Sequence, residues 1–393
     1  MYEKRIKFLC MHKTLMPEFS ERSRKLNGLL STEVRKEYGI YFTPSSARSR
    51  IIELLQSLEV SPRTILEPSF GSGEFLDDMK TTYPNSTLYG VELSKDMYDE
   101  YPESPTLVNA DFLEYRADPV DLVIGNPPYV VTTIKNTHCQ TGRGNLFVLF
   151  IYKCLTEHMH EGSTLAFVLP TSFYNCSYYE PCRRYISKNA TLLHVETIDA
   201  KYYETGQKTM IMILRKEVPR NSNFILSRAS SVYITPEYAR LQKSLDGAST
   251  LRELGFAVKT GDVVWNQEKE KLTDTTGTPI IYTSNIVNNT LTFPKLKGGK
   301  KQYIQGFGKK AAVGPAIAVS RGYGNNYAFN WAVIPRGTEF YGENHVNVIS
   351  GPSEHFDRVV SSLRSEKTEE FIKMFVGNGA LSKTELESIL PIF

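Results

Sequence analysis

The sequence predicts an α/β protein with a mostly parallel sheet covered by helices on both faces, followed by a smaller domain that is irregular α/β or β-rich. Two observations support this class. In the first half of the chain, short apolar runs alternate with helical patterns, which is typical of parallel strands joined by helices. The alternation stops near Lys216, and from Thr250 onward Gly, Asn, Thr and Tyr are frequent. At roughly 150 residues per domain, 393 residues suit two or three domains.

Seven apolar runs are expected to form the strands of a Rossmann-like sheet. In chain order they are Thr64–Glu67, Leu88–Glu92, Thr106–Asn109, Asp121–Gly125, Thr164–Leu169, Leu192–Ile198 and Thr209–Leu214. Helical patterns fall between these runs, including Ala47–Leu58 and Leu146–Glu157. The second domain has a strand-like run at Val313–Ser320 and a helical pattern at Glu369–Phe375, followed by the segment Lys383–Ile389.

The same changes in composition predict the domain boundaries. We expect a basic helical segment over 1–45, the sheet domain over 46–216, a connector over 217–245 and the second domain over 246–393.

The overall composition excludes several classes of protein. An apolar content of 41% and a net charge of +3 fit an ordinary globular protein. The five cysteines form no CxxC pair, which argues against a disulfide framework or a zinc site, and we expect no metal. We find no signal-peptide pattern and no apolar run near the ~18 residues that span a bilayer. The expected location is the cytoplasm, or the interior of the host cell if the source is a virus.

The most informative residues are Asn126, Pro127, Pro128 and Tyr129, which follow the fourth predicted strand. Ligands of open α/β sheets bind at the carboxyl ends of the strands. An Asn side-chain oxygen and a carbonyl held by a rigid Pro-Pro turn can both accept hydrogen bonds from one NH2 group. The ring of Tyr129 can stack on a flat heterocycle. The alternative interpretation is a simple proline turn.

A glycine loop follows the first predicted strand. Glu67 and Pro68 lead into Gly71 and Gly73, which allow a ligand to approach the backbone closely. Leu76 stands where a dinucleotide fingerprint has its third Gly, and there is no P-loop Lys. The loop therefore favours a ligand without phosphate, such as S-adenosylmethionine.

Three further residues follow the next two predicted strands. Glu92 is 19 positions after Gly73, which suits hydrogen bonds to ribose hydroxyls. Asp111 can accept from the exocyclic amine of the cofactor's adenine, and Phe112 can stack on that ring. The alternatives are a solvated carboxylate at Glu92, a helix N-cap at Asp111 and a core side chain at Phe112.

With the Thr-Pro motif that precedes the first helix, these motifs resemble the gamma group of N6-adenine DNA methyltransferases. Tyr41, Thr43 and Pro44 match the group's Thr-Pro motif, which closes over the methionine end of the cofactor, although Thr43 and Pro44 also suit the N-cap and N1 of a helix. The order of Thr-Pro motif, glycine loop, Asn-Pro-Pro-Tyr and C-terminal recognition domain is that of the group. The resemblance covers roughly residues 35–215. The one departure is Glu67-Pro68-Ser69-Phe70, where many members have Asp-Pro-Ala-Cys.

The resemblance implies the activity and the remaining site residues. It implies transfer of a methyl group from S-adenosylmethionine to adenine N6 in duplex DNA, with the base flipped out of the helix. Asn126 and the Pro127 carbonyl would hold the amine, and Tyr129 and a second aromatic would cover the base. Tyr203 matches that second aromatic best, with Tyr202 next, and core packing is the alternative for either. A separate restriction endonuclease is a possible partner.

A basic segment in the second domain suggests contact with DNA. Six lysines and no acid lie between Lys295 and Lys310, so we expect all six to be unpaired and Lys297, Lys300 and Lys301 to contact phosphates. Arg321 and Asn325 lie in a polar segment that can reach base edges. Solvated surface is the alternative.

Three other functions compete with this one. Glutamine N5-methyltransferases of proteins also use Asn-Pro-Pro-Tyr, but they generally lack the Thr-Pro motif and a long C-terminal domain. RNA N6-adenine is another methyl acceptor. A non-catalytic DNA-binding relative is the third, and the intact motifs argue against it.

Overall fold

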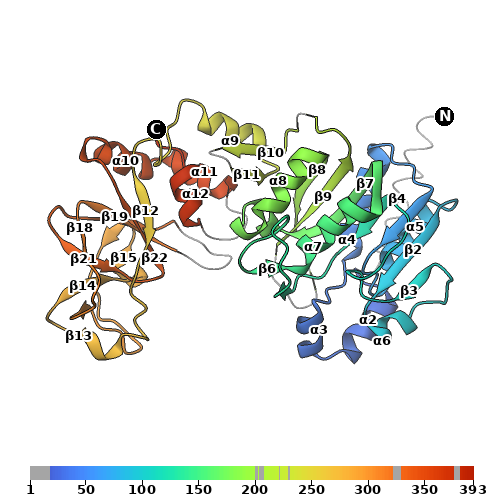
Figure 1. The fold of residues 1–393 in the computed structure, drawn as a ribbon, viewed down its shortest axis with the longest axis horizontal. Helices are drawn as coiled ribbons and strands as arrows, with labels where there is room; N and C mark the ends of the chain where they lie inside the picture. The colour runs from blue at the N-terminus through green and yellow to red at the C-terminus, as the bar shows by residue number, and fades with distance from the viewer. Residues whose placement is uncertain are drawn as a thin grey trace. The chain divides into compact units, whose positions relative to one another are not determined.

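The computed structural model describes residues 18–199, 202, 208–220, 222–228, 231–321, 329–375 and 381–393. The chain divides into two compact units (Figure 1). The first unit comprises residues 1–173 and 178–225, and the second comprises residues 174–177 and 226–393. Within the described residues, no helix has the length and apolar character needed to cross a membrane.

The first unit is built on the expected seven-stranded sheet, in the order β3-β2-β1-β4-β7-β9-β8. Its strands are β1 (Thr64–Glu67), β2 (Thr87–Glu92), β3 (Leu107–Asn109), β4 (Val120–Gly125), β7 (Met159–Pro170), β8 (Ala190–Ile198) and β9 (Thr209–Lys216). Only β9 runs antiparallel to its neighbours, so the carboxyl ends of the other six strands lie at one edge. The mostly parallel sheet predicted from the seven apolar runs is confirmed.

Helices cover both faces of this sheet (Figure 1). The α-helices described in this unit are α2 (Glu21–Leu29), α3 (Thr32–Tyr38), α4 (Ser45–Ser57), α5 (Glu74–Thr82), α6 (Lys95–Asp99), α7 (Leu146–Lys153) and α8 (Glu180–Asn189). Ile51 of α4 and Phe75 of α5 pack with Leu122 and Ile124 of β4 in one buried cluster. Burial on both faces explains why the strands are continuous apolar runs rather than alternating patterns.

Two element boundaries differ from the predictions. Helix α4 begins at Ser45, with Pro44 as the N-cap and no side-chain cap, so the expected N-cap at Thr43 is wrong by one residue. The helix expected over Leu146–Glu157 ends as α-helix at Lys153 and continues as a π-helical turn, Cys154–His158. Strand β7 follows immediately and is longer than its apolar run because it starts at Met159.

Among its described residues, the second unit is β-rich, with four α-helices. One sheet has the order β12-β22-β19-β20, and a second has the order β13-β17-β14-β21-β18. The strands are β12 (Ala257–Thr260), β13 (Leu272–Thr273), β14 (Thr278–Ile281), β17 (Tyr303–Ile304), β18 (Ala312–Val313), β19 (Ala316–Ser320), β20 (Trp331–Ile334), β21 (Glu339–Gly342) and β22 (Val346–Ser350), with small pairs β10 (Ile225–Arg228) and β11 (Ser231–Ile234), and β15 (Ile286–Val287) and β16 (Thr290–Leu291). The helices are α9 (Tyr238–Leu245), α10 (Phe356–Leu363), α11 (Glu366–Phe375) and α12 (Lys383–Ser388).

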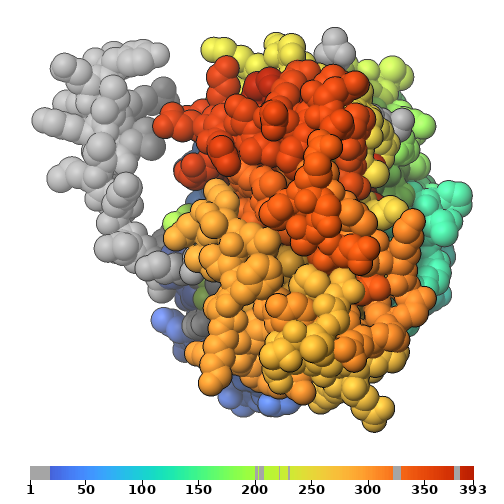
Figure 2. All heavy atoms as spheres, turned by 90° about the vertical axis from the view of Figure 1, so that its left-hand side faces the viewer, coloured from blue at the N-terminus to red at the C-terminus, as the bar shows by residue number. Residues whose placement is uncertain are grey.

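Two expectations for this region are refined by the structure. The strand expected over Val313–Ser320 is interrupted at Gly314-Pro315, since proline cannot donate to a strand ladder. Residues 217–245, expected to connect the domains, contain strands and a helix. Leu226, Tyr233 and Leu241 from this segment lie in the core of the second unit. Figure 2 draws the residues of this unit as spheres, coloured from yellow to red.

Candidate active site

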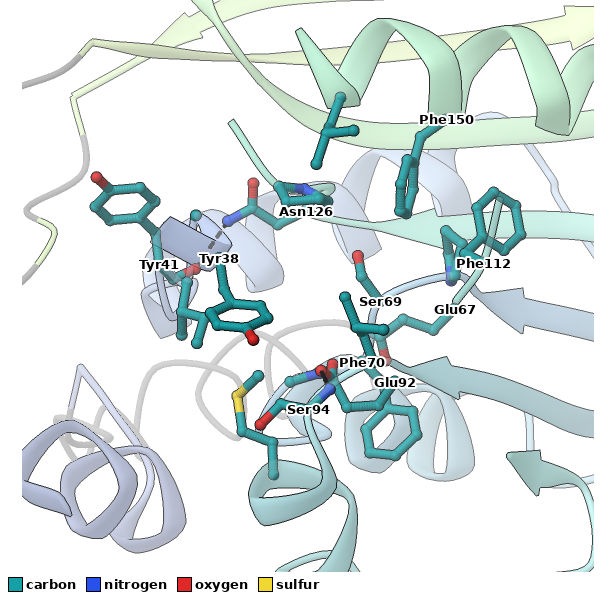
Figure 3. Close-up of a pocket in the computed structure, with 18 of the residues that line it drawn as sticks. Tyr38, Tyr41, Glu67, Ser69, Phe70, Glu92, Ser94, Phe112, Asn126 and Phe150 are labelled. Atoms are coloured by element: carbon teal, nitrogen blue, oxygen red, sulfur yellow. Dashed lines mark hydrogen bonds between the residues drawn. The ribbon is translucent and has the colours of Figure 1, made fainter. Parts of the chain in front are cut away.

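A cavity of about 380 Å³ lies at the carboxyl edge of the first unit's sheet. Its lining comes from the turn between α3 and α4, from the loops after β1, β2, β3 and β4, and from α7 (Figure 3). Several residues expected to bind cofactor or substrate line it: Tyr41, Thr43, Glu67, Pro68, Gly71, Glu92, Asp111, Phe112, Asn126 and Pro128. Four motifs that are far apart in the sequence therefore meet at one cavity.

The glycine loop joins β1 to α5, and its two glycines differ in their surroundings. Both have positive φ, +53° at Gly71 and +73° at Gly73, where other residues are strained. A Cβ at Gly71 would meet nothing within 4 Å, and this residue lines the cavity. A Cβ at Gly73 would clash with the ring of Tyr101, and Gly73 is not among the lining residues. Close approach to a ligand is thus available at Gly71, whereas packing explains Gly73.

Glu92 ends β2 and organises the glycine loop. The backbone N–H of Gly71 donates to Glu92 Oε2 and that of Ser94 donates to Oε1, both at 2.8 Å. The carboxyl is almost fully buried, and burial raises its pKa although these two hydrogen bonds oppose the shift. A solvated loop carboxylate is therefore wrong for Glu92.

Glu67, at the end of β1, is buried and lacks a complete set of partners. Its Oε2 atom and the nearby Ser69 hydroxyl have no hydrogen-bond partner among the described residues. Burial is the main reason that the pKa of Glu67 lies well above its usual value, and the charges of Glu92, Asp78 and Glu74 raise it further. A buried polar atom without a partner costs free energy, so this site is suited to a ligand that donates hydrogen bonds.

Asp111 and Phe112 follow β3 and line another part of the cavity. Asp111 Oδ1 accepts from the backbone N–H of Leu113 at 2.8 Å, in a turn rather than at a helix start. The buried ring of Phe112 lies 4.7 Å from that of Phe150 and 5.1 Å from that of His158, measured between centroids. Phe150, on α7, also lines the cavity and was not predicted.

Asn126 is held by the Thr-Pro motif. Its Nδ2 donates to the Tyr41 carbonyl oxygen at 3.0 Å and to Thr43 Oγ1 at 3.1 Å. Because a carbonyl only accepts, the amide nitrogen must face Tyr41. Asn126 Oδ1 is consequently turned the other way, and it is buried without a partner among the described residues (Figure 3).

Arg48 fixes the Thr-Pro motif and was missed in the sequence. It is almost completely buried on α4, and its Nη1 donates to the Thr43 carbonyl oxygen at 2.6 Å. The same guanidinium pairs with Glu74 at 3.2 Å and with Asp78 at 2.7 Å. An Arg in the first turn of a helix gave no signal of this role, because both carboxylates come from α5 after the glycine loop.

The remainder of the Asn-Pro-Pro-Tyr turn lies beside the cavity. Pro128 is part of the lining, whereas Pro127 and Tyr129 are not. The ring of Tyr129 stacks with that of Tyr41 at 6.3 Å and meets that of Phe147 edge-on at 5.9 Å. Tyr203 lies outside the described residues. Tyr202 is buried, and its hydroxyl is hydrogen-bonded to Thr209 Oγ1 at 3.1 Å.

The lysines of the second unit are not all unpaired, contrary to expectation. Lys301 lies 3.7 Å from Asp274, and Lys309 lies 2.8 Å from Asp262. Lys300 Nζ lies 5.1 Å from the Tyr282 ring centroid and 5.5 Å from that of Trp265. The sequence segment lacks acids, but the fold supplies acids and aromatic rings from elsewhere.

Three other residues were predicted to contact DNA, and no metal was predicted. Lys297 has no ion pair among the described residues. Arg321 Nη1 donates to the Asn344 carbonyl oxygen at 3.0 Å, and Asn325 falls outside the described residues. The part of the chain that the structure describes contains no cluster of side chains able to hold a metal ion.

Comparisons with known proteins identify relatives of this chain. Residues 38–203 match the Eco57I restriction-modification methylase family. The modification methylase CviBIII of Paramecium bursaria Chlorella virus NC1A is 29% identical over 391 residues, which is 96% of this chain and 99% of the relative. The type II methyltransferase M.CvrRI of Paramecium bursaria Chlorella virus XZ-6E is 30% identical over 392 residues, which is 96% of this chain and 100% of the relative.

Among solved structures, a class I S-adenosylmethionine-dependent methyltransferase of Listeria monocytogenes aligns with a TM-score of 0.42 and 19% identity, covering 51% of this chain and 70% of that one. The sequence relationships are the stronger finding, because the two viral relatives align over almost their whole length. The chain belongs to the type II methyltransferases, the S-adenosylmethionine-dependent DNA methyltransferases of restriction–modification systems.

Proposed function

We propose that this enzyme methylates the N6 amine of adenine in duplex DNA, after the target base has left the helix. The observation that carries the proposal is the Asn126 amide. Its nitrogen donates hydrogen bonds to the Tyr41 carbonyl and the Thr43 hydroxyl. Its buried Oδ1 has no partner among the described residues and is left to accept a hydrogen bond from a ligand. An exocyclic amine is a donor of the required kind, and the Pro127 carbonyl would accept its second N–H.

The cavity suits S-adenosylmethionine. Glu92 would bind the ribose hydroxyls, and Asp111 and Phe112 would hold the adenine ring, with Phe150 packed behind Phe112. The unpartnered Oε2 of Glu67 would accept from the cofactor's amino group. We assign the remaining cofactor contacts to Tyr41, Thr43, Pro68 and Gly71, whereas Pro44 and Gly73 do not line the cavity and would support the loops that do. When bound, S-adenosylmethionine supplies an electrophilic methyl group on a sulfonium.

The side chains of this site act on the amine by orientation. The lone pair of an exocyclic amine is delocalised into the ring, which makes it a poor nucleophile. Hydrogen bonds from both N–H groups to Asn126 and Pro127 favour a pyramidal nitrogen whose lone pair points at the methyl group. Fixed alignment of two reactants can contribute about 7–11 kcal/mol in favourable systems. Tyr129, and Tyr203 from the segment outside the described residues, would stack on the target base.

The units divide this work in our proposal. Residues 46–216, together with the Thr-Pro motif just before them, carry cofactor binding and methyl transfer, and residues 246–393 bind the duplex. Lys297, Lys300 and Lys301 would contact phosphates, although Lys300 and Lys301 would first leave Tyr282 and Asp274. Arg321 and Asn325 would approach base edges. A cognate restriction endonuclease would cut the same sequence when it is unmethylated.

The test is to incubate the purified chain with isotopically labelled S-adenosylmethionine and mixed-sequence plasmid DNA, and then to separate the digested nucleosides. We expect the label in N6-methyl-2'-deoxyadenosine from duplex DNA, and little label from single-stranded DNA, RNA or protein in parallel reactions. Label on cytosine alone, or only on RNA or on a protein glutamine, would refute the proposal. Long-read sequencing of the product then gives the sequence that is methylated.

A further inference from the structure

A short hairpin follows the Asn-Pro-Pro-Tyr turn directly. Strand β5 (Val131–Thr132) pairs antiparallel with β6 (Gly144–Asn145). At the base of the hairpin, the Leu146 N–H donates to the Val130 carbonyl oxygen at 2.9 Å, where α7 begins. Residues 131–145, called here the 131–145 hairpin, therefore start and end beside the residues that we assign to the target base.

The hairpin is fixed by buried polar contacts. Gln140, which is 3% exposed, donates through Nε2 to the Ile134 carbonyl oxygen at 3.2 Å and accepts from the Asn145 N–H at 2.8 Å. The Thr141 N–H donates to the Tyr178 carbonyl oxygen at 2.9 Å. A second anchor joins the Cys182 N–H of α8 to the Cys139 carbonyl oxygen at 3.0 Å. A loop held in this way loses little conformational entropy when it binds a partner.

Large apolar side chains are exposed on this fixed hairpin. Val131 is 50% exposed and Ile134 is 47% exposed, and Ile134 also lines the cavity. Tyr178 is 42% exposed and its ring lies against Gly142, where a Cβ would come within 2.8 Å of it. Single exposed apolar residues need no explanation, but three around one hairpin at the edge of a cavity indicate a contact surface.

The charge of the hairpin has one sign. From Leu122 to Thr156 the sequence contains no Asp or Glu. Lys135 and Arg143 are exposed in the loop, and among the described residues neither has a carboxylate partner. Lys153, by contrast, is buried and paired with Glu157 at 2.7 Å, so it is not part of the surface.

We propose that the 131–145 hairpin binds the DNA strand that carries the target base. Lys135 and Arg143 contact the phosphates on either side of the extruded nucleotide, and Ile134 and Val131 cover the apolar base and sugar surface that extrusion uncovers. This inference rests on the proposed function. Charge favours DNA over a protein partner, because a strand with one base removed from the stack offers phosphates and apolar base faces together.

The test compares three purified variants with the wild type. Lys135→Ala/Arg143→Ala removes the cations, and Ile134→Ser removes the apolar contact. The matched control is Arg63→Ala/Lys188→Ala, which removes the same charge from the amino edge of the sheet: Arg63 precedes β1 and Lys188 precedes β8. Titration calorimetry with S-adenosylmethionine checks that every variant keeps its fold and its cofactor site.

Two duplex oligonucleotides carry the sequence that the wild type methylates. In one the target adenine is paired, and in the other it faces an abasic site, so that it is already free to leave the stack. We expect the double-cation variant to bind the paired duplex at least several-fold more weakly, with the slope of log affinity against log salt reduced by up to about 1.8. Ile134→Ser should slow single-turnover methylation of the paired duplex, and its rate on the abasic duplex should return to that of the wild type. The control should behave as the wild type on both.

The outcomes separate this inference from the proposed function. If the wild type methylates no DNA, so that no such sequence is found, the function itself is wrong. If the wild type is active but the double-cation variant matches the control in affinity and salt slope, the hairpin does not contact phosphates and the inference is wrong. Ile134→Ser that is equally slow on both duplexes would also overturn it, since the defect would then lie in the reaction rather than in extrusion. If a hairpin variant loses binding to a protein partner while its DNA affinity is unchanged, the surface belongs to that partner instead.

Discussion

Replacement of Thr43 by Val tests how the site orients Asn126. The substitution removes the Thr43 hydroxyl, one of two acceptors of the Asn126 amide, and leaves the Tyr41 carbonyl in place at 3.0 Å. The backbone carbonyl of Thr43 keeps its bond to Arg48, so the turn itself should hold. A hydrogen bond of this kind contributes about 0.5–1.5 kcal/mol net. If that free energy orients the amide in the transition state, kcat should fall about 2- to 13-fold.

The assay is single-turnover methylation at saturating cofactor and DNA, with the dissociation constant of S-adenosylmethionine measured by calorimetry. Thr43→Ser is the matched control, because it restores the hydroxyl and should recover most of the rate. The assay separates two roles of Thr43, which are orientation of Asn126 and contact with the cofactor. An unchanged rate with weaker cofactor binding in Thr43→Val would mean that the hydroxyl serves the cofactor and not Asn126, which would refute the reasoning.

Three further predictions address the other parts of the site. Asn126→Ala should abolish methylation while cofactor affinity stays near wild type, and more than a few per cent residual activity would remove Asn126 from the reaction. Glu67 has a raised pKa, so its contribution to the free energy of unfolding is full below about pH 4.5 and falls as pH rises toward the folded-state pKa. In the cofactor-free protein, Glu67→Gln should therefore raise the melting temperature more at pH 8 than at pH 5. A difference in melting temperature that does not depend on pH would contradict this. Replacement of Lys297, Lys300 and Lys301 by Ala should weaken all DNA sequences alike and lower the salt slope by up to about 0.9 per contact, whereas an unchanged slope would identify solvated surface.

The sequence predicted the sheet because its strands are buried on both faces. Such strands are continuous apolar runs, and β1 coincides with its predicted range, Thr64–Glu67. Motifs at the ends of these strands were brought together for a topological reason: six strands place their carboxyl ends at one edge. The sequence therefore indicated which residues share a cavity, although it could not show how they contact one another.

What the sequence missed depends on contacts between distant residues. Arg48 lies on an ordinary amphipathic helix, and its carboxylate partners became visible only in the fold. Asn175 is a second example: it belongs to the second unit, where its Nδ2 donates to Glu385 Oε1 at 2.6 Å across 210 residues of sequence. A truncation after Lys216 would leave that buried amide without this partner. The boundary drawn from composition is therefore a poor place to separate the units.

The surroundings of Asn126 also explain why an amide, and not an acid, suits this position. The Tyr41 carbonyl accepts hydrogen bonds and cannot donate them, and it lies 3.0 Å from one end of the Asn126 side chain. A carboxylate there would place two acceptors against each other in a partly buried site, and it would have to bind a proton to remove the repulsion. An amide satisfies Tyr41 and Thr43 with its nitrogen and keeps its oxygen for the substrate. The choice of Asn is thus determined by the backbone of the Thr-Pro motif, 85 residues earlier in the chain.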